Sequence, residues 1–203
     1  MHPRSSARTH GYIDVIRRSL ASARRRSLDT PGLRPAAVLV PLYLREAREH
    51  LVFTLRTDRV EYHKGQISFP GGAVDPEDRD RVATALRESR EEIGLEAADV
   101  EVLGLLDDLP ATRSGFCITP VVGLIRKSPY PFMANPAEVA EILLLPLSWL
   151  LEPAHMQQRS LRDEAGHVWV DFAFEWNGRV IWGATGRILK GFLDRIRAGM
   201  ADE

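Results

Sequence analysis

Residues Lys64–Glu96 read KGQISFPGGAVDPEDRDRVATALRESREEIGLE, and this segment is the most informative part of the sequence. Pro70-Gly71-Gly72 predicts an irregular loop, because the two glycines accept positive φ and the proline keeps Phe69 extended. Such a loop lets the backbone approach a ligand closely. The acidic run Asp75-Pro76-Glu77-Asp78 is typical of a helix start, and Gly94 is typical of a helix stop.

The helix expected between these marks has two different faces. Glu88, Glu91 and Glu92 fall on one flank, since residues three and four apart are neighbours on a helix. Like charges at this spacing cost roughly 0.2–0.5 kcal/mol per pair, which a divalent cation with oxygen ligands would offset. A solvated glutamate-rich surface is the alternative, and the coincidence of loop, stop and spacing weighs against it. The small and apolar residues form a separate stripe: Val82, Ala85, Leu86, Ser89 and Ile93.

The end of this stretch carries the most specific pattern in the chain. Arg87–Leu95, RESREEIGL, resembles the tail of the Nudix box, which runs R-E-x-x-E-E-x-G and then an apolar residue. Counting back along the box puts its opening glycine and glutamate at Ala73 and Arg79. One extra loop residue accounts for both differences, with Gly72 as the glycine and Asp78 in place of the glutamate.

A second resemblance lies upstream of the box. Phe53–Thr57 (FTLRT) and His63–Gly72 (HKGQISFPGG) are similar to the extra signature of coenzyme A pyrophosphatases, a subfamily of Nudix hydrolases. The resemblance covers most of residues 36–190, because similar stretches continue at Asp75–Asp78, Thr84–Glu88, Pro146–Ser148 and Ile181–Thr185.

The resemblance implies a fold, a reaction and a set of site residues. The implied fold is α/β, the Nudix α/β/α sandwich with a central mixed sheet. The implied reaction is hydrolysis of the pyrophosphate linkage of coenzyme A, its thioesters or its oxidised forms, with Mg²⁺ or Mn²⁺, to 3′,5′-ADP and a 4′-phosphopantetheine product. The expected catalytic residues are Glu88, Glu91, Glu92 and Arg87, with the three glutamates as metal ligands, and the expected substrate-binding residues are Arg56, Gly71 and Gly72.

The rest of the chain predicts strands interleaved with helices. Strands are expected over Ala36–Leu44, Leu51–Arg56, Val102–Leu106, Ile118–Ile125 and His167–Glu175, with the polar residues Arg45–His50 as a turn. Helices are expected over Tyr12–Arg26 and Ala184–Met200, and Glu141–Leu151 predicts a strand running into a short helix. This alternation favours a layered α/β domain. We expect residues 1–34 to form a helical extension packed on a Nudix domain of residues 35–203.

The composition of the chain limits the classes of partner that we expect it to bind. The 203 residues, 44% of them hydrophobic, suit one domain. The net charge of −1 provides no global field for nucleic acid or an anionic membrane, so we expect a small-molecule substrate and neither of those partners. A single cysteine, Cys117, excludes an internal disulfide and a cysteine metal cage and suits a reducing compartment. Ile142–Leu151, the longest apolar run, is far short of the ~20 residues that span a membrane. A cytoplasmic protein is expected; the oligomeric state stays open, with a homodimer as one option.

Residues other than the three glutamates are further candidates for catalysis or substrate binding. Glu138 and Glu141 are alternatives to a box glutamate as the proton acceptor, although a polar flank before a strand would give the same letters. Arg87, four residues before Glu91, is expected to orient a ligand carboxylate. The segment Ala111–Phe116 could face the pantetheine arm or the adenine. Three further cations could meet the phosphates of coenzyme A: Arg59, His63 and Lys64.

Two other functions fit part of this pattern. The first is a Nudix hydrolase of another nucleoside diphosphate derivative, such as ADP-ribose, NADH or a dinucleotide, and the upstream signature weighs against it. The second is a catalytically silent Nudix-like nucleotide-binding module, and the intact R-E-x-x-E-E core weighs against that.

Overall fold

The chain enters its main sheet through a long hairpin. The computed structural model describes residues 11–201 except 23, 58–64, 163–165 and 167. Strands β1 (Arg34–Arg45) and β2 (Arg48–Arg56) pair antiparallel, and Glu46 and Ala47 between them have φ of 52° and 58°. Positive φ at both central positions is typical of the type I′ turn, whose twist matches paired strands. The turn therefore has two residues instead of the six expected over Arg45–His50, because the polar residues on either side continue the ladder.

Strand β1 is the centre of an eight-stranded mixed sheet. One edge of β1 pairs in parallel with β7 (Phe116–Ile125). The other edge changes partner, from β4 (Gly71–Ala73) near its start to β2 near its end. The sheet is completed by β3 (Ile67–Ser68) and β8 (Val139–Pro146) on β2, and by β5 (Val100–Leu105) and β6 (Leu109–Ala111) on β7. The sequence did not predict β3, β4 and β6, because two or three residues carry no readable alternation.

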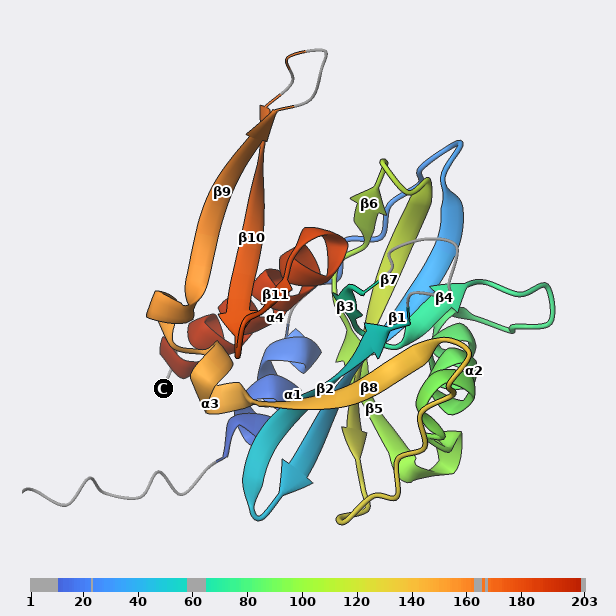
Figure 1. Ribbon diagram of the computed structural model, residues 1–203, viewed down its shortest axis with the longest axis vertical. Helices are drawn as coiled ribbons and strands as arrows, with labels where there is room; N and C mark the ends of the chain where they lie inside the picture. The colour runs from blue at the N-terminus through green and yellow to red at the C-terminus, as the bar shows by residue number, and fades with distance from the viewer. Residues whose placement is uncertain (1–10, 23, 58–64, 163–165, 167, 202–203) are drawn as a thin grey trace, which may run out of the picture.

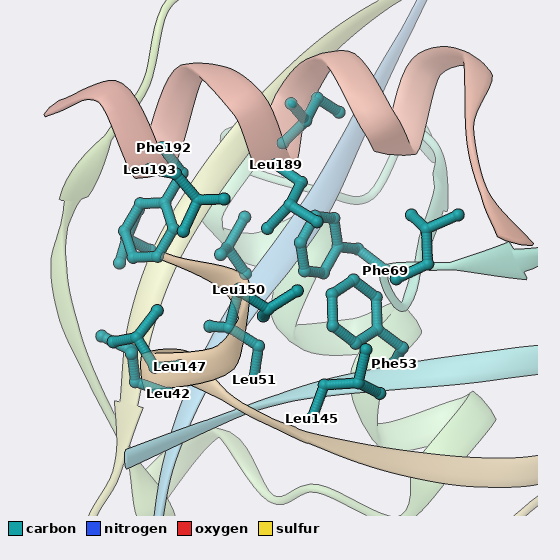
Figure 2. Packing of buried hydrophobic residues seen from close by; sticks show 14 of the residues in the cluster. Leu42, Leu51, Phe53, Phe69, Leu145, Leu147, Leu150, Leu189, Phe192 and Leu193 are labelled. Atoms are coloured by element: carbon teal, nitrogen blue, oxygen red, sulfur yellow. The ribbon is translucent and has the colours of Figure 1, made fainter. Parts of the chain in front are cut away.

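Helices cover both faces of this sheet (Figure 1). Helix α2 (Arg81–Ile93) packs on one face, over a core that includes Ile93. Helices α1 (Tyr12–Ser22) and α4 (Gly183–Ala201) cover the other, and Figure 2 shows leucine and phenylalanine side chains of α4 packed toward Phe53 of β2. These three layers are an α/β/α sandwich with a central mixed sheet, so the predicted fold class is confirmed.

Helix α2 begins later than the sequence predicted. Its N-cap is Asp80, whose Oδ1 accepts the backbone N–H of Ala83 at 2.8 Å. The acidic run that was expected to start the helix forms a turn: the N–H of Asp78 donates to the carbonyl of Asp75, whose own N–H donates to the Asp78 carboxylate. The prediction of a start at Asp75 was wrong because aspartate side chains can close a local turn in competition with a helix.

Helix α1 packs on α4. Its Val15 is buried, and a Cβ added to Gly199 of α4 would lie 3.0 Å from Val15 Cγ1, so the two helices are in close contact. The helix ends at Ser22, and beyond it Arg25 pairs with the buried carboxylate of Asp108 at 2.5 Å. The helix was predicted to extend over this basic run and ends short of it. The division into residues 1–34 and 35–203 stays a prediction.

A smaller antiparallel sheet, with strand order β11-β10-β9, precedes α4. Its strands are β9 (Met156–Arg162), β10 (Val168–Trp176) and β11 (Arg179–Ile181), and it follows the short helix α3 (Leu147–Leu150) expected after β8. The sequence predicted β10 from its alternation but not the polar β9. Short 3₁₀ turns at Ala97–Asp99 and Pro153–His155 complete the described elements. None of the helices described is long and apolar enough to cross a membrane.

Candidate active site

The three box glutamates of helix α2 differ in how much of each side chain is exposed to solvent. The stripe that packs on the sheet includes the fully buried Ser89 and Ile93, as the sequence predicted. Glu92 borders this stripe and is only 2% exposed. The side chains of Glu88 and Glu91 are 16% and 46% exposed. The carboxylates therefore run from the core to the surface, with Glu92 nearest the sheet.

Arg87 holds several of the carboxylates around it. Its Nε and Nη2 donate to the two oxygens of Asp78 at 3.1 and 3.0 Å. Its Nη1 donates to Glu88 at 2.8 Å and to Glu91 at 3.2 Å. The guanidinium lowers the pKa of Asp78 to about 2. The structure thus confirms the expected Arg87–Glu91 contact and gives Asp78 a role, because this carboxylate fixes the arginine that orients two box glutamates.

Gly71 and Gly72 form part of strand β4 and not the irregular loop that the sequence predicted. They pair with Val38 and Ala37 of β1. Sheet pairing uses only backbone N–H and C=O groups, so residues without a side chain can take part. A Cβ on Gly72 would lie 2.5 Å from the carboxylate of Glu88. The close backbone approach seen here is to a side chain of the protein itself, and the expected approach to a ligand stays a prediction.

Glu92 is a buried carboxylate with incomplete pairing. Burial raises its pKa to about 8, against the opposing effect of Arg56. Arg56 Nη1 lies 3.7 Å from Glu92 Oε1, while Glu92 Oε2 and Arg56 Nε are buried without a hydrogen-bond partner. Burial also raises the pKa of Glu88. Buried polar groups of this kind are normally satisfied, and an unpaired carboxylate oxygen can accept a bond from a bound water or cation.

The structure separates the two candidates for a late proton acceptor. The N–H of Glu138 donates to the carbonyl of Asn135, whose own N–H donates to the carbonyl of Glu92 at 2.9 Å. The charge of Glu138 raises the pKa of Glu88 and of Glu92. Glu141 is exposed, and its carboxylate accepts a hydrogen bond from Arg179 of β11 at 2.7 Å. Glu138 therefore belongs to the carboxylate cluster, whereas Glu141 connects the two sheets.

The remaining predicted contacts are only partly described. Arg59, His63 and Lys64 lie outside the described residues. Phe116, at the start of β7, has the guanidinium of Arg34 5.2 Å from its ring centroid, so a cation of the chain already occupies one face of the ring. This contact leaves the predicted adenine or pantetheine contact untested.

The donor set around Glu92 fits a hard divalent cation. Within the described part of the chain, no three Asp, Glu, His or Cys side chains are gathered closely enough to hold a metal as they stand. The expected three-glutamate metal site therefore stays a prediction. Glu92 nevertheless offers a buried unpaired oxygen, and two further carboxylates raise its pKa. Mg²⁺ and Mn²⁺ prefer oxygen ligands and offset the repulsion of clustered carboxylates.

A profile described as the NUDIX domain matches residues 33–165, well over half of the chain. The chain belongs to the Nudix family. Nudix hydrolases are pyrophosphohydrolases that act on nucleoside diphosphate derivatives, and they generally require divalent ions such as Mg²⁺ or Mn²⁺. The family assignment confirms the prediction of an enzyme that cleaves a phosphorus-containing anhydride.

Relatives of this Nudix chain share much of its length. The uncharacterized Nudix hydrolase NudL of Citrobacter koseri is 37% identical over 164 residues, which are 80% of this chain and 82% of the relative. NudL of Yersinia pestis strain Pestoides F is 36% identical over 163 residues, 80% of each chain. Among solved structures, a binary complex of the C. elegans Ap4A hydrolase has a TM-score of 0.53 at 14% identity, covering 84% of this chain and all of that one. At this identity the similarity shows the fold alone.

Proposed function

We propose that this enzyme hydrolyses the pyrophosphate linkage of coenzyme A or its derivatives to 3′,5′-ADP and a 4′-phosphopantetheine product. One observation carries the proposal: a residue from each part of the upstream signature lies against a box carboxylate. Arg56, in its first part, lies 3.7 Å from Glu92. Gly72, at its last residue, leaves no room for a Cβ beside Glu88. Strands β2 and β3 carry the two parts side by side, with Thr54 opposite Ser68.

The chemical problem is the charge on the pyrophosphate, whose oxygens repel a nucleophile. When bound by Glu88, Glu91 and Glu92, divalent cations would neutralise this charge and lower the pKa of a water. Arg87 would orient two of these ligands through the contacts it already makes. Gly71 and Gly72 would bring the backbone close to the substrate, and Arg56 would place a positive charge at the diphosphate.

We assign the proton acceptor to Glu138, with a box glutamate as the alternative. Glu138 lies in the carboxylate cluster, whereas the carboxylate of Glu141 accepts a hydrogen bond from Arg179. A general base must be able to reach the water that it deprotonates, directly or through one further water. The position of Glu138 beside Glu88 and Glu92 satisfies this requirement better than the position of Glu141.

The proposed substrate is tested by incubating the purified protein with coenzyme A, ADP-ribose, NADH and diadenosine polyphosphates, with Mg²⁺ or Mn²⁺, and identifying the products by mass. We expect 3′,5′-ADP from coenzyme A, and loss of turnover without loss of the fold in Glu92→Gln. A preference for another member of the panel would favour hydrolysis of a different nucleoside diphosphate derivative. Binding without hydrolysis of any member would favour the catalytically silent module. The homodimer and the cytoplasmic location stay predictions.

A further inference from the structure

We propose that Thr57 and Asn135 are positioning residues that hold Glu138 beside Glu88 and Glu92. The inference rests on the proposed role of Glu138 in hydrolysis and extends it to residues that touch neither metal nor substrate. Its basis is a set of hydrogen bonds that connect residues 135–138, the segment before β8, to the end of β2 and to the end of α2.

Thr57 fastens this segment from the β2 side. Its backbone N–H donates to the carbonyl of Glu138 at 2.9 Å, and its hydroxyl donates to the carbonyl of Ala137 at 3.1 Å. Thr57 directly follows Arg56, the residue that faces Glu92. Residues 56 and 57 therefore position both the Arg56 guanidinium and the carbonyls that precede β8 relative to the carboxylate of Glu92.

Asn135 fastens the segment from the α2 side. Its N–H donates to the carbonyl of Glu92 at 2.9 Å, which satisfies one of the open carbonyls at the helix end. Its carbonyl accepts from the N–H groups of Glu138 and Val139 at 3.0 and 2.8 Å, and its Oδ1 accepts from the N–H of Ala137 at 3.1 Å. The backbone around Glu138 is thus wrapped on a residue bonded directly to the main chain of Glu92.

A register shift completes the arrangement. Along the β2–β8 pair, Leu55 lies opposite Glu141, but Arg56 lies opposite Val139, so Ala140 is an extra residue on β8. Bulges of this kind re-aim side chains and are frequent next to active sites. The shift brings Glu138, and not Val139, to the position where Thr57 can bond to it.

Together these contacts form a clamp that bonds the backbone on both sides of Glu138. Thr57 and Asn135 together make six hydrogen bonds to or within the segment. These bonds fix the backbone of Glu138 relative to the main chain of Glu92.

The test uses Thr57→Val, which removes the hydroxyl donor at nearly constant shape, and Thr57→Ser, which keeps it. Both are measured alone and combined with Glu138→Gln, using whichever substrate of the panel the wild-type protein cleaves. We expect Thr57→Val to lower kcat about 10-fold with little change in KM, Thr57→Ser to restore most of the rate, and Thr57→Val to cause no further loss when Glu138 is already glutamine. Additive losses, or a Thr57→Ser variant as slow as Thr57→Val, would overturn the inference.

A second measurement does not depend on turnover. Amide hydrogen exchange over residues 135–139 should become faster in Thr57→Val and in Asn135→Ala, and stay near the wild-type rate in Thr57→Ser. Unchanged exchange in both of the first two variants would reject the clamp. Failure of the substrate proposal has a different signature, since it would show as absence of 3′,5′-ADP from coenzyme A in the wild-type protein while the exchange pattern and the kinetic cycle on another substrate still hold.

Discussion

Replacing Gly72 by alanine should reduce catalysis far more than stability. A Cβ at this position would lie 2.5–2.6 Å from the carboxylate atoms of Glu88, whereas ordinary contact begins near 3.4 Å. The carboxylate must therefore retreat by roughly 0.9 Å, and a displacement of about 1 Å at a reacting centre can cost about 100-fold in rate. We expect kcat to fall by about this factor. Because the clashing atoms end a flexible side chain, the free energy of unfolding should change by less than about 1 kcal/mol.

Gly71 provides the matched control. Its φ of 156° disfavours other residues, and a Cβ would lie 2.4 Å from the carbonyl oxygen of Ala37 and 2.5 Å from Cα of Val38. Both are backbone atoms of the central strand, which cannot move without breaking its ladder. Gly71→Ala should therefore lose roughly 2–4 kcal/mol of stability. Urea unfolding and steady-state kinetics with Mg²⁺ measure both effects, and wild-type kcat in Gly72→Ala or wild-type stability in Gly71→Ala would refute the reasoning.

Three further predictions concern single residues. Arg87 lowers the pKa of Asp78 from 3.8 to about 2, so the charged carboxylate adds about 2 kcal/mol to the free energy of unfolding above pH 4, and this contribution disappears as the pH falls toward 2. Urea unfolding of Asp78→Asn should show a free energy of unfolding lower by this amount at neutral pH, and stability equal to the wild type there would contradict the prediction. Ala47→Gly should raise stability by about 1 kcal/mol by relieving a positive φ of 58°, and a lower melting temperature would count against this strain. Glu138→Gln should lower kcat at least about 10-fold while Glu141→Gln stays near wild type, and the reverse order would exclude Glu138 as the base.

The sequence predicted best what depends on neighbours along the chain. The contact between Arg87 and Glu91 follows from helical spacing, and the helix stop follows from the left-handed conformation of Gly94, whose φ is 67°. The start of the same helix was misplaced, since a turn closed by aspartate side chains uses the same residues as a capped helix. Local rules alone do not decide between these two outcomes.

The parts that were missed depend on contacts between distant segments. Gly71 and Gly72 form a strand only because β1 offers them an edge. The different surroundings of Glu138 and Glu141 reflect one extra residue on β8 in the β2–β8 pair, and the sequence NPAEVAEIL does not indicate this residue. Thr57 contacts this segment through one backbone and one side-chain hydrogen bond, and a single threonine after a strand gave no signal of either. The Asn135-Pro136 pair is a turn signal that could have pointed to the segment before β8.

The change of partner along β1 brings both parts of the upstream segment to helix α2. β4 and β2 share one edge of β1, so the chain that leaves β2 after Arg56 returns to the same edge at Gly71. Its departure lies against Glu92, and its return lies against Glu88. Both carboxylates belong to one helix on one face of the sheet. Under the proposed function, a substrate bound by these segments would meet two of the proposed metal ligands at fixed positions. The spacing between the two carboxylates is set by the helix, and the spacing between Arg56 and Gly72 is set by the sheet.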